Sequence, residues 1–245
     1  MGVIKRFRRR LNPQRRLFEQ YAAEAAADEY INWLCSMIGG WLEPRSGNLA
    51  AFVYALKHLP ATGAVVEIGS FLGASTNVLT YLSQKHADGR PVFNCDPWIF
   101  EHTEKPIGGY FNAGTPEFRD YAVRTFIQNA RTFSGRNLPH SFEMASGEFL
   151  KRWAGNEECA DLFGRRVKLG GPIAFAYVDG DHTYEGADAD MRGIVPHLVP
   201  GGLIFMDDSA DGCPFGSGRV AQEFQSNPNF SVVFKTGHYL FRREK

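Results

Sequence analysis

Three short segments constrain the fold of this chain most, because each reads as an apolar strand followed by a turn. They are AVVEIGSFLGAST (residues 64–76), AFAYVDGDHTYEG (174–186) and GGLIFMDDS (201–209). The first turn is rich in glycine, and the other two carry carboxylates. In an open α/β sheet, ligands bind beyond the carboxyl ends of the strands. The segments therefore predict such a sheet, with a ligand site built from these turns.

Strands and helices alternate along the chain, which indicates an α/β fold with a doubly wound sheet. Near-continuous apolar runs predict central parallel strands, because such strands are covered on both faces. Strands are predicted at 64–68, 91–95, 141–145, 173–178 and 203–206, helices at 17–38, 49–58, 74–85, 116–133 and 184–198, and a terminal hairpin at 230–235 and 238–242. The antiparallel hairpin indicates an altered edge of the sheet.

We expect two regions in the chain. Residues 1–60 would form a basic tail and accessory helices, and residues 61–245 would form the ligand-binding domain. The accessory helices could cover a pocket or pack against another subunit, so a homo-oligomer is possible. The first 18 residues are basic but lack the apolar core of a signal peptide. A weak contact of this stretch with a membrane surface also stays open, although a solvated tail is favoured.

Composition narrows the class of protein. The 245 residues are 44% hydrophobic and 22% charged, which is ordinary for a globular protein. A formal net charge of +0 provides no global attraction to nucleic acid, so a nucleic-acid partner is not expected. No apolar run is long enough for a transmembrane helix. The four cysteines lack metal-ligand spacing, which favours free thiols in a reducing compartment and a cytoplasmic location.

The glycine turn after the first strand has the features of a cofactor cradle. Gly69 permits a tight turn, and Gly73 lets the backbone approach a ligand or lets the following helix pack closely. Glu67 precedes the turn, and Asp96 ends the next strand, where an acid can accept hydrogen bonds from a ribose. The GxxxG spacing differs from the GxGxxG of dinucleotide-binding turns. The pattern therefore favours a nucleoside-type cofactor over a nicotinamide dinucleotide.

The segments EIGSFLGAST, CDPW, VDGDHTYEG and GGLIFMDD resemble those of class I S-adenosylmethionine-dependent methyltransferases. More narrowly, residues 64–241 are similar to the metal-dependent O-methyltransferases, a group with catechol, macrolide-sugar and cephalosporin-hydroxylase-like members. The resemblance implies a seven-stranded sheet of mostly parallel strands with the last strand antiparallel. It also implies that Glu67, Gly69 and Ser75 border the methionine part of S-adenosylmethionine, that Asp96 binds the ribose and that Ser146 lies near the adenine.

Three carboxylates, those of Asp179, Asp207 and Asp208, follow two central strands and should meet at one edge of the sheet. Like charges brought together repel, so a cation or a proton must relieve them. Oxygen ligands suit Mg²⁺. The resemblance implies metal ligands at the same three positions. Asp181 is either a further ligand, a neighbour of the ligands or a turn-forming residue.

His182 follows Asp179 by three residues and is the candidate general base. Methyl transfer to oxygen requires that the acceptor hydroxyl lose its proton, and a neutral imidazole can take that proton near pH 7. The catechol-type enzymes have a lysine at this offset, whereas the macrolide-sugar type resembles this chain in having histidine. The alternative role for His182 is a hydrogen-bonding residue beside the metal.

The prediction is thus an S-adenosylmethionine-dependent, Mg²⁺-assisted O-methyltransferase that acts on a small hydroxylated molecule. The aromatic and glycine-rich stretch 98–118 would be a lid over the acceptor or an ordinary packed loop, and residues 211–218 another wall. Two alternatives remain. One is an NAD-linked oxidoreductase on a similar sheet, and the other is a cofactor-binding subunit that supports a hydroxylase-like tailoring enzyme.

Overall fold

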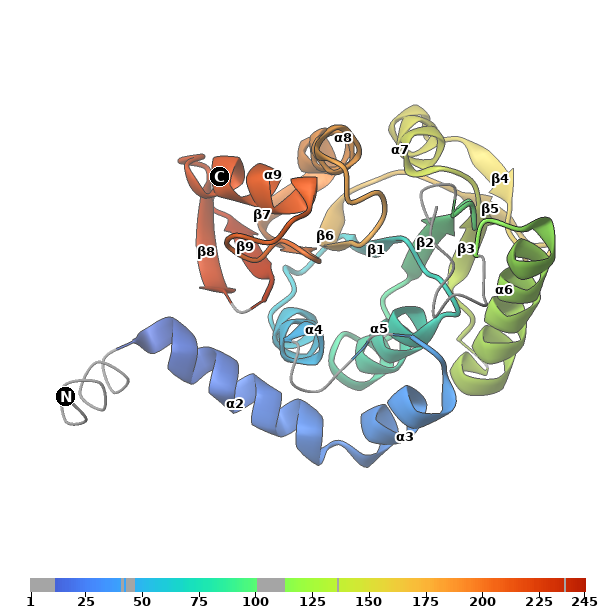
Figure 1. Cartoon of the computed structure of the whole chain (residues 1–245), viewed down its shortest axis with the longest axis horizontal. Coiled ribbons are helices and arrows are strands. Elements are labelled where there is room, and N and C mark those ends of the chain that lie inside the picture. The colour runs from blue at the N-terminus through green and yellow to red at the C-terminus, as the bar shows by residue number, and fades with distance from the viewer. Residues whose placement is uncertain (1–11, 41, 43–46, 101–112, 136, 236) are drawn as a thin grey trace.

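A seven-stranded sheet forms the centre of the molecule (Figure 1). The computed structural model describes residues 12–40, 42, 47–100, 113–135, 137–235 and 237–245. The strand order is β3-β2-β1-β6-β7-β9-β8. The strands are β1 (Ala64–Ile68), β2 (Val92–Asp96), β3 (His140–Glu143), β6 (Ile173–Val178), β7 (Leu198–Met206), β8 (Phe230–Lys235) and β9 (Tyr239–Arg243). β9 is antiparallel to both of its neighbours, and the other neighbouring strands are parallel. The predicted fold class is therefore confirmed.

Helices cover both faces of the sheet (Figure 1). α2 (Pro13–Ala27), α3 (Glu29–Met37), α4 (Asn48–Lys57) and α5 (Ala74–His86) lie on one face, and α6 (Pro116–Asn129) lies beyond α5. α7 (Ser146–Gly155), α8 (Tyr184–Ile194) and α9 (Gly216–Gln225) lie on the other face. The side chains of each strand alternate between two apolar cores. One core includes Val65 and Tyr177 with the α4 side chains, and the other includes Val66 and Val178 with those of α7 and α8.

The strand order reverses between β1 and β6, and this reversal places the site. β2 and β3 continue the sheet on one side of β1, whereas β6 and β7 continue it on the other. The connections leaving β1 and β6 therefore run to opposite faces, and a crevice opens beyond their carboxyl ends. Residues 69–76, 179–183 and 207–209 all follow strands at this edge.

The predicted helix 17–38 was wrong, because Asp28 divides it. The Asp28 side chain accepts the N–H groups of Tyr30 and Ile31, so it caps α3 as a separate helix. Lys85 and Tyr81 of α5 also donate to this carboxylate, at 2.7 and 3.0 Å. Tertiary partners on α5 thus help to fix a break that helical periodicity alone does not show.

The structure adds elements that the sequence pattern did not indicate. A two-stranded antiparallel sheet, β4 (Glu158–Ala160) with β5 (Arg166–Lys168), falls between α7 and β6 in the order of the chain. The predicted helix 116–133 ends as α6 at Asn129 and continues as a π-helical turn, Ala130–Ser134. α4 is buried along its length and belongs to the same core as the sheet. The division at residue 60 stays a prediction.

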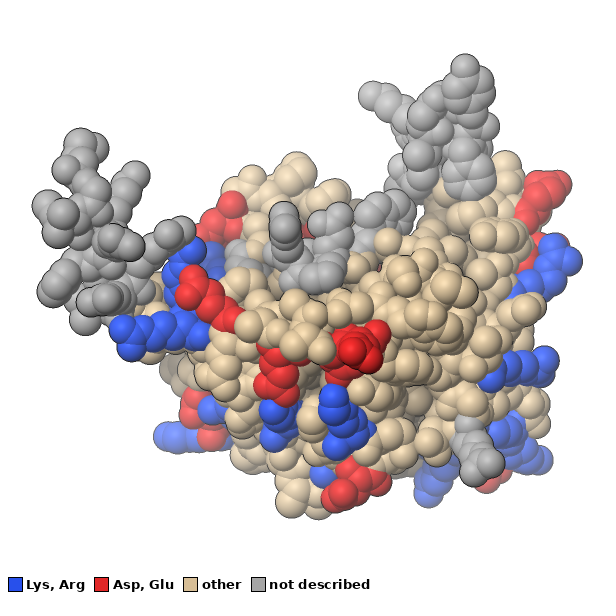
Figure 2. All heavy atoms as spheres, turned by 90° about the horizontal axis from the view of Figure 1, so that it is seen from below, with Lys and Arg blue, Asp and Glu red and all other residues tan. Residues whose placement is uncertain are grey.

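The surface in Figure 2, viewed from the side of α2 and α3, carries acidic and basic side chains interspersed. No helix within the described residues combines the length and apolar character needed to cross a bilayer. The four cysteines are free thiols, and Cys95 and Cys159 are buried. The basic residues 1–11 lie outside the described residues, so the expected tail stays a prediction.

Candidate functional site

The glycine turn between β1 and α5 packs directly against the end of β6. Gly69 has φ +82°, a conformation that L side chains rarely adopt. A Cβ atom at this position would lie 1.9 Å from the carbonyl oxygen of Asp179. The turn that should hold the cofactor and the first predicted metal ligand are therefore in contact through their backbones.

The Asp96 carboxylate shapes this turn. Its Oδ2 accepts the N–H groups of Ser70 and Phe71, each at 2.8 Å, and its Oδ1 accepts the N–H of Trp98 at 2.6 Å. Phe71 and Trp98 have positive φ values of 45° and 50°. Non-glycine residues hold such conformations only where their surroundings fix them, and these hydrogen bonds do so. Asp96 thus organises the turn itself, a role that the sequence did not reveal.

Glu67 is fully buried at the end of β1. The Thr76 hydroxyl donates to its Oε2 at 2.5 Å, while its Oε1 has no hydrogen-bond partner among the described residues. Burial raises the pKa of Glu67 to about 8 despite the hydrogen bonds from Ser75 and Thr76. A buried carboxylate oxygen without a hydrogen bond is unfavourable, so a cationic or hydrogen-bond-donating group of a ligand would bind there.

We expect Glu67 to make the ligand-free protein less stable as pH rises. Its folded-state pKa, about 8, lies above the ordinary 4.5, so the folded state holds a proton that the unfolded state has lost. This contribution is complete below about pH 4.5 and disappears as pH rises through 8. The free energy of unfolding should fall on the order of 2 kcal/mol more from pH 5 to 8.5 in the wild type than in Glu67→Gln. Parallel profiles in urea titrations would contradict the raised pKa.

Ser146 is the first residue of α7 and meets a buried acid of α8. It donates a side-chain hydrogen bond to Asp190, and burial raises the pKa of Asp190 to about 6. Asp190 Oδ2 has no partner among the described residues and would lie 3.2 Å from a Cβ at Gly180. The region predicted for the adenine is therefore held against the turn that follows β6.

The three predicted metal ligands do meet at the carboxyl ends of β6 and β7. His182 lies between two of them, with Nε2 3.2 Å from Asp179 Oδ1 and Nδ1 3.3 Å from Asp208 Oδ2. These side chains are about one-third exposed, whereas Asp207 is only 14% exposed. Asp181 instead accepts the Thr183 N–H in a turn and is exposed.

The sequence reasoning missed His238, which also joins this cluster. It lies between β8 and β9, with Nδ1 2.9 Å from Asp207 Oδ1 and 2.9 Å from the donating N–H of Asp208. One ring nitrogen cannot donate and accept at once, so the two contacts belong to different tautomers. The antiparallel pairing of β9 with β7 was the available signal, since it brings the start of β9 beside the end of β7.

Comparison with known proteins now identifies the chain. A family model described as a methyltransferase domain matches residues 66–209, which include the glycine turn and the acidic cluster, Asp179, Asp207 and Asp208. The chain belongs to this methyltransferase-domain family. A search of curated protein sequences finds no match.

Solved structures support the same fold for this methyltransferase domain. The O-methyltransferase from Bacillus cereus, in complex with SAH, is 13% identical with a TM-score of 0.59, and the match covers 92% of this chain and 96% of that one. The calicheamicin methyltransferase is 14% identical with a TM-score of 0.56, and the match covers 94% and 93% of the two chains. The resemblance expected from the sequence is therefore confirmed at the level of family and fold.

Within the acidic cluster of the methyltransferase domain, neighbouring side chains shift one another's pKa values. Burial, followed by the negative charge of Asp207, raises the pKa of Asp179 to about 7. Burial also acts to raise the pKa of Asp207, but His238, together with the hydrogen bonds from Asp179 and Asn48, lowers that pKa. The hydrogen bond with Asp179 raises the pKa of His182. Without a cation, protons relieve the repulsion between these acids.

The donor set of the cluster fits a divalent cation. Asp207, Asp208 and His238 each offer one ligand atom, and these atoms lie within 4.8 Å of one another. Carboxylate oxygens suit Mg²⁺ and Mn²⁺, and an imidazole nitrogen is also a ligand for transition metals. Asp179 is hydrogen-bonded to Asp207 and so borders the same space.

Phe215, within the predicted wall 211–218, packs against the candidate base. Its ring centroid lies 5.2 Å from that of His182, and its side chain is 44% exposed. The Gly216 N–H donates to the His182 carbonyl at 2.9 Å, where α9 begins. The wall is thus anchored to the site. Residues 101–112 of the proposed lid lie outside the described residues, so the lid stays a prediction.

Proposed function

We propose that this protein transfers a methyl group from S-adenosylmethionine to an oxygen of a small hydroxylated molecule, with the help of a divalent cation such as Mg²⁺. The observation that carries the proposal is the direct contact between the glycine turn at Gly69 and the backbone of Asp179. A methyl donor in the turn and an acceptor oxygen at the acids would be neighbours. Methyl transfer requires this proximity.

In this proposal, the residues of the turn hold the cofactor. The unpartnered Oε1 of Glu67 would face the methionine end, together with Gly69, Gly73 and Ser75. Asp96 Oδ1 accepts one described N–H and keeps a lone pair for a ribose hydroxyl. Ser146 would border the adenine. S-Adenosylmethionine would supply an electrophilic methyl group.

The acidic cluster would hold the cation through Asp179, Asp207 and Asp208. A bound divalent cation would make an acceptor hydroxyl more acidic. His182 lies among these residues and is about one-third exposed. Its Nε2 and Nδ1 face Asp179 and Asp208, and a neutral imidazole has a single N–H. It therefore donates to one of these carboxylates, and its other nitrogen can take the proton of the hydroxyl.

Replacement of His182 by Ala should slow methyl transfer roughly 10²-fold or more. The wild-type rate should rise with pH as His182 loses its proton. His182→Ala should lose this dependence. His197→Ala, at the opposite end of β7, is the matched control and should keep the wild-type profile. An identical pH–rate profile in His182→Ala would exclude His182 as the base.

Calorimetric titration of S-adenosylmethionine, in Mg²⁺ and then in chelator, tests the proposed function. We expect micromolar binding in both conditions, followed by formation of S-adenosylhomocysteine with hydroxylated acceptors only when metal is present. No cofactor binding in either condition would overturn the proposal. Cofactor binding without turnover on any hydroxylated acceptor would favour a subunit that supports another enzyme.

A further inference from the structure

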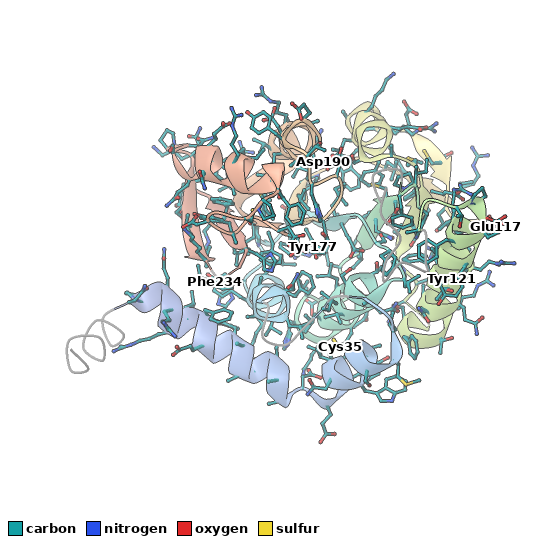
Figure 3. All side chains as sticks on the ribbon, viewed as in Figure 1. Cys35, Glu117, Tyr121, Tyr177, Asp190 and Phe234 are labelled. Atoms are coloured by element: carbon teal, nitrogen blue, oxygen red, sulfur yellow. The ribbon has the colours of Figure 1, made fainter. Side chains whose placement is uncertain are left out.

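A buried polar layer lies directly beneath the acidic cluster, on the side of α4. Its members are Asn48, the first residue of α4, and Tyr177, near the end of β6. Figure 3 shows Tyr177 between the central strands and α4. Asn48 is 2% exposed and Tyr177 is 1% exposed, so neither contacts bulk solvent. No motif used above contains Asn48.

Asn48 donates to the least exposed of the three predicted ligands. Its side-chain Nδ2 lies 2.7 Å from Asp207 Oδ1 and 3.4 Å from the Tyr177 hydroxyl oxygen. An amide flipped by 180° would place a carbonyl oxygen against the carboxylate, so the amide nitrogen must face Asp207. The two hydrogens of one amide group can therefore serve both Asp207 and Tyr177.

Tyr177 orients the neighbouring predicted metal ligand, Asp179, in the same way. Its hydroxyl donates to Asp179 Oδ2 at 2.8 Å. The ring is stacked on Phe205 with centroids 5.6 Å apart, and it meets Phe52 of α4 edge-on at 4.8 Å. Packing on both sides holds the ring, so the hydroxyl has a fixed position from which to orient Asp179.

These contacts fix the orientation of two predicted metal ligands. Asp207 Oδ1 accepts Asn48 and Asp179 Oδ2 accepts Tyr177, so a buried donor holds each carboxylate in place. We propose that Asn48 is a positioning residue for the metal site, which makes α4 part of the machinery for methyl transfer. This inference rests on the metal role proposed above. Residues that orient metal ligands typically contribute 10- to 100-fold to metal affinity.

The test is Mn²⁺ binding to the full chain, measured from the electron paramagnetic resonance signal of free Mn²⁺. Asn48→Ala should bind Mn²⁺ 10- to 100-fold more weakly than the wild type, with S-adenosylmethionine affinity unchanged by calorimetry. Tyr177→Phe should also weaken Mn²⁺ binding. Asn48→Ser, whose hydroxyl ends one bond short of the amide nitrogen, provides a second variant if the alanine protein does not fold.

Tyr54→Phe is the matched control, because it removes a hydroxyl from the same helix away from the acids. Tyr54 lies on α4 and accepts a hydrogen bond from Arg242. This variant should keep wild-type Mn²⁺ affinity. Equal weakening in Tyr54→Phe and Asn48→Ala would assign the loss to general loosening of α4 and overturn the inference.

The remaining outcomes separate the two proposals. Wild-type Mn²⁺ affinity in a folded Asn48 variant would overturn the positioning role and leave the metal role intact. Absence of Mn²⁺ binding by the wild-type protein would overturn the metal role, and the positioning role with it.

Discussion

Asp207→Ala should abolish metal-dependent turnover while leaving S-adenosylmethionine binding largely intact. Asp207 Oδ1 accepts Asn48 at 2.7 Å and lies 2.9 Å from His238, so the substitution removes a proposed ligand and leaves buried donors without an acceptor. The cofactor turn does not use this side chain. We expect a loss of at least about 10³-fold in turnover, because the acceptor would lose both its position and its acidity.

The measurement compares turnover in Mg²⁺ and in chelator with calorimetric cofactor affinity. Asp188→Ala is the control, since Asp188 pairs with Arg192 on α8 away from the cluster. It should resemble the wild type in both assays. Undiminished turnover by Asp207→Ala in metal-free buffer would remove the metal from the mechanism.

Gly69→Ala should abolish cofactor binding and destabilise the fold. The added Cβ would lie 1.9 Å from the Asp179 carbonyl oxygen, and backbone on both sides must move to accommodate it. The positive φ of 82° adds strain of roughly 1–2 kcal/mol. Together these effects should lower the free energy of unfolding by about 4 kcal/mol or more.

Gly164→Ala is the control that separates backbone strain from steric overlap of the added Cβ. Gly164 has φ +77°, but a Cβ there would meet nothing within 4 Å. We expect it to lower the free energy of unfolding by roughly 1–2 kcal/mol and to bind cofactor normally. Denaturant unfolding and calorimetry measure both quantities. Equal destabilisation in the two variants would show that contact with Asp179 does not constrain the turn.

The sequence predicted those parts of the structure that depend on local pattern. The apolar run at 173–178 became β6, and the carboxylates after β6 and β7 met because parallel strands end at one edge. The glycine turn after β1 adopted its close approach at Gly69 because only glycine fits there. In each case the chemistry lies within a few residues of the strand that positions it.

The features that were missed depend on contacts between distant segments. Asn48 reaches Asp207 across 159 positions, and His238 enters the cluster only because β9 pairs with β7. The break at Asp28 similarly depends on Lys85, 57 positions away. Local periodicity carries no information about such partners, and one sequence does not show which asparagine or histidine the folded sheet will bring inward.

The cofactor turn and the acidic cluster also differ in when they can form during folding. The hydrogen bond from Ser70 to Asp96 closes a loop across 26 positions, so the cofactor turn can assemble within one compact stretch of chain. The acidic cluster with its neighbours Asn48 and His238 requires α4, two central strands and the final hairpin to be in place together. Such long-range pairings form late. A nascent chain without its last hairpin would thus lack His238 beside the acidic cluster while already containing the cofactor turn. The arrangement of the acidic cluster seen here is therefore complete only once β9 has paired with β7.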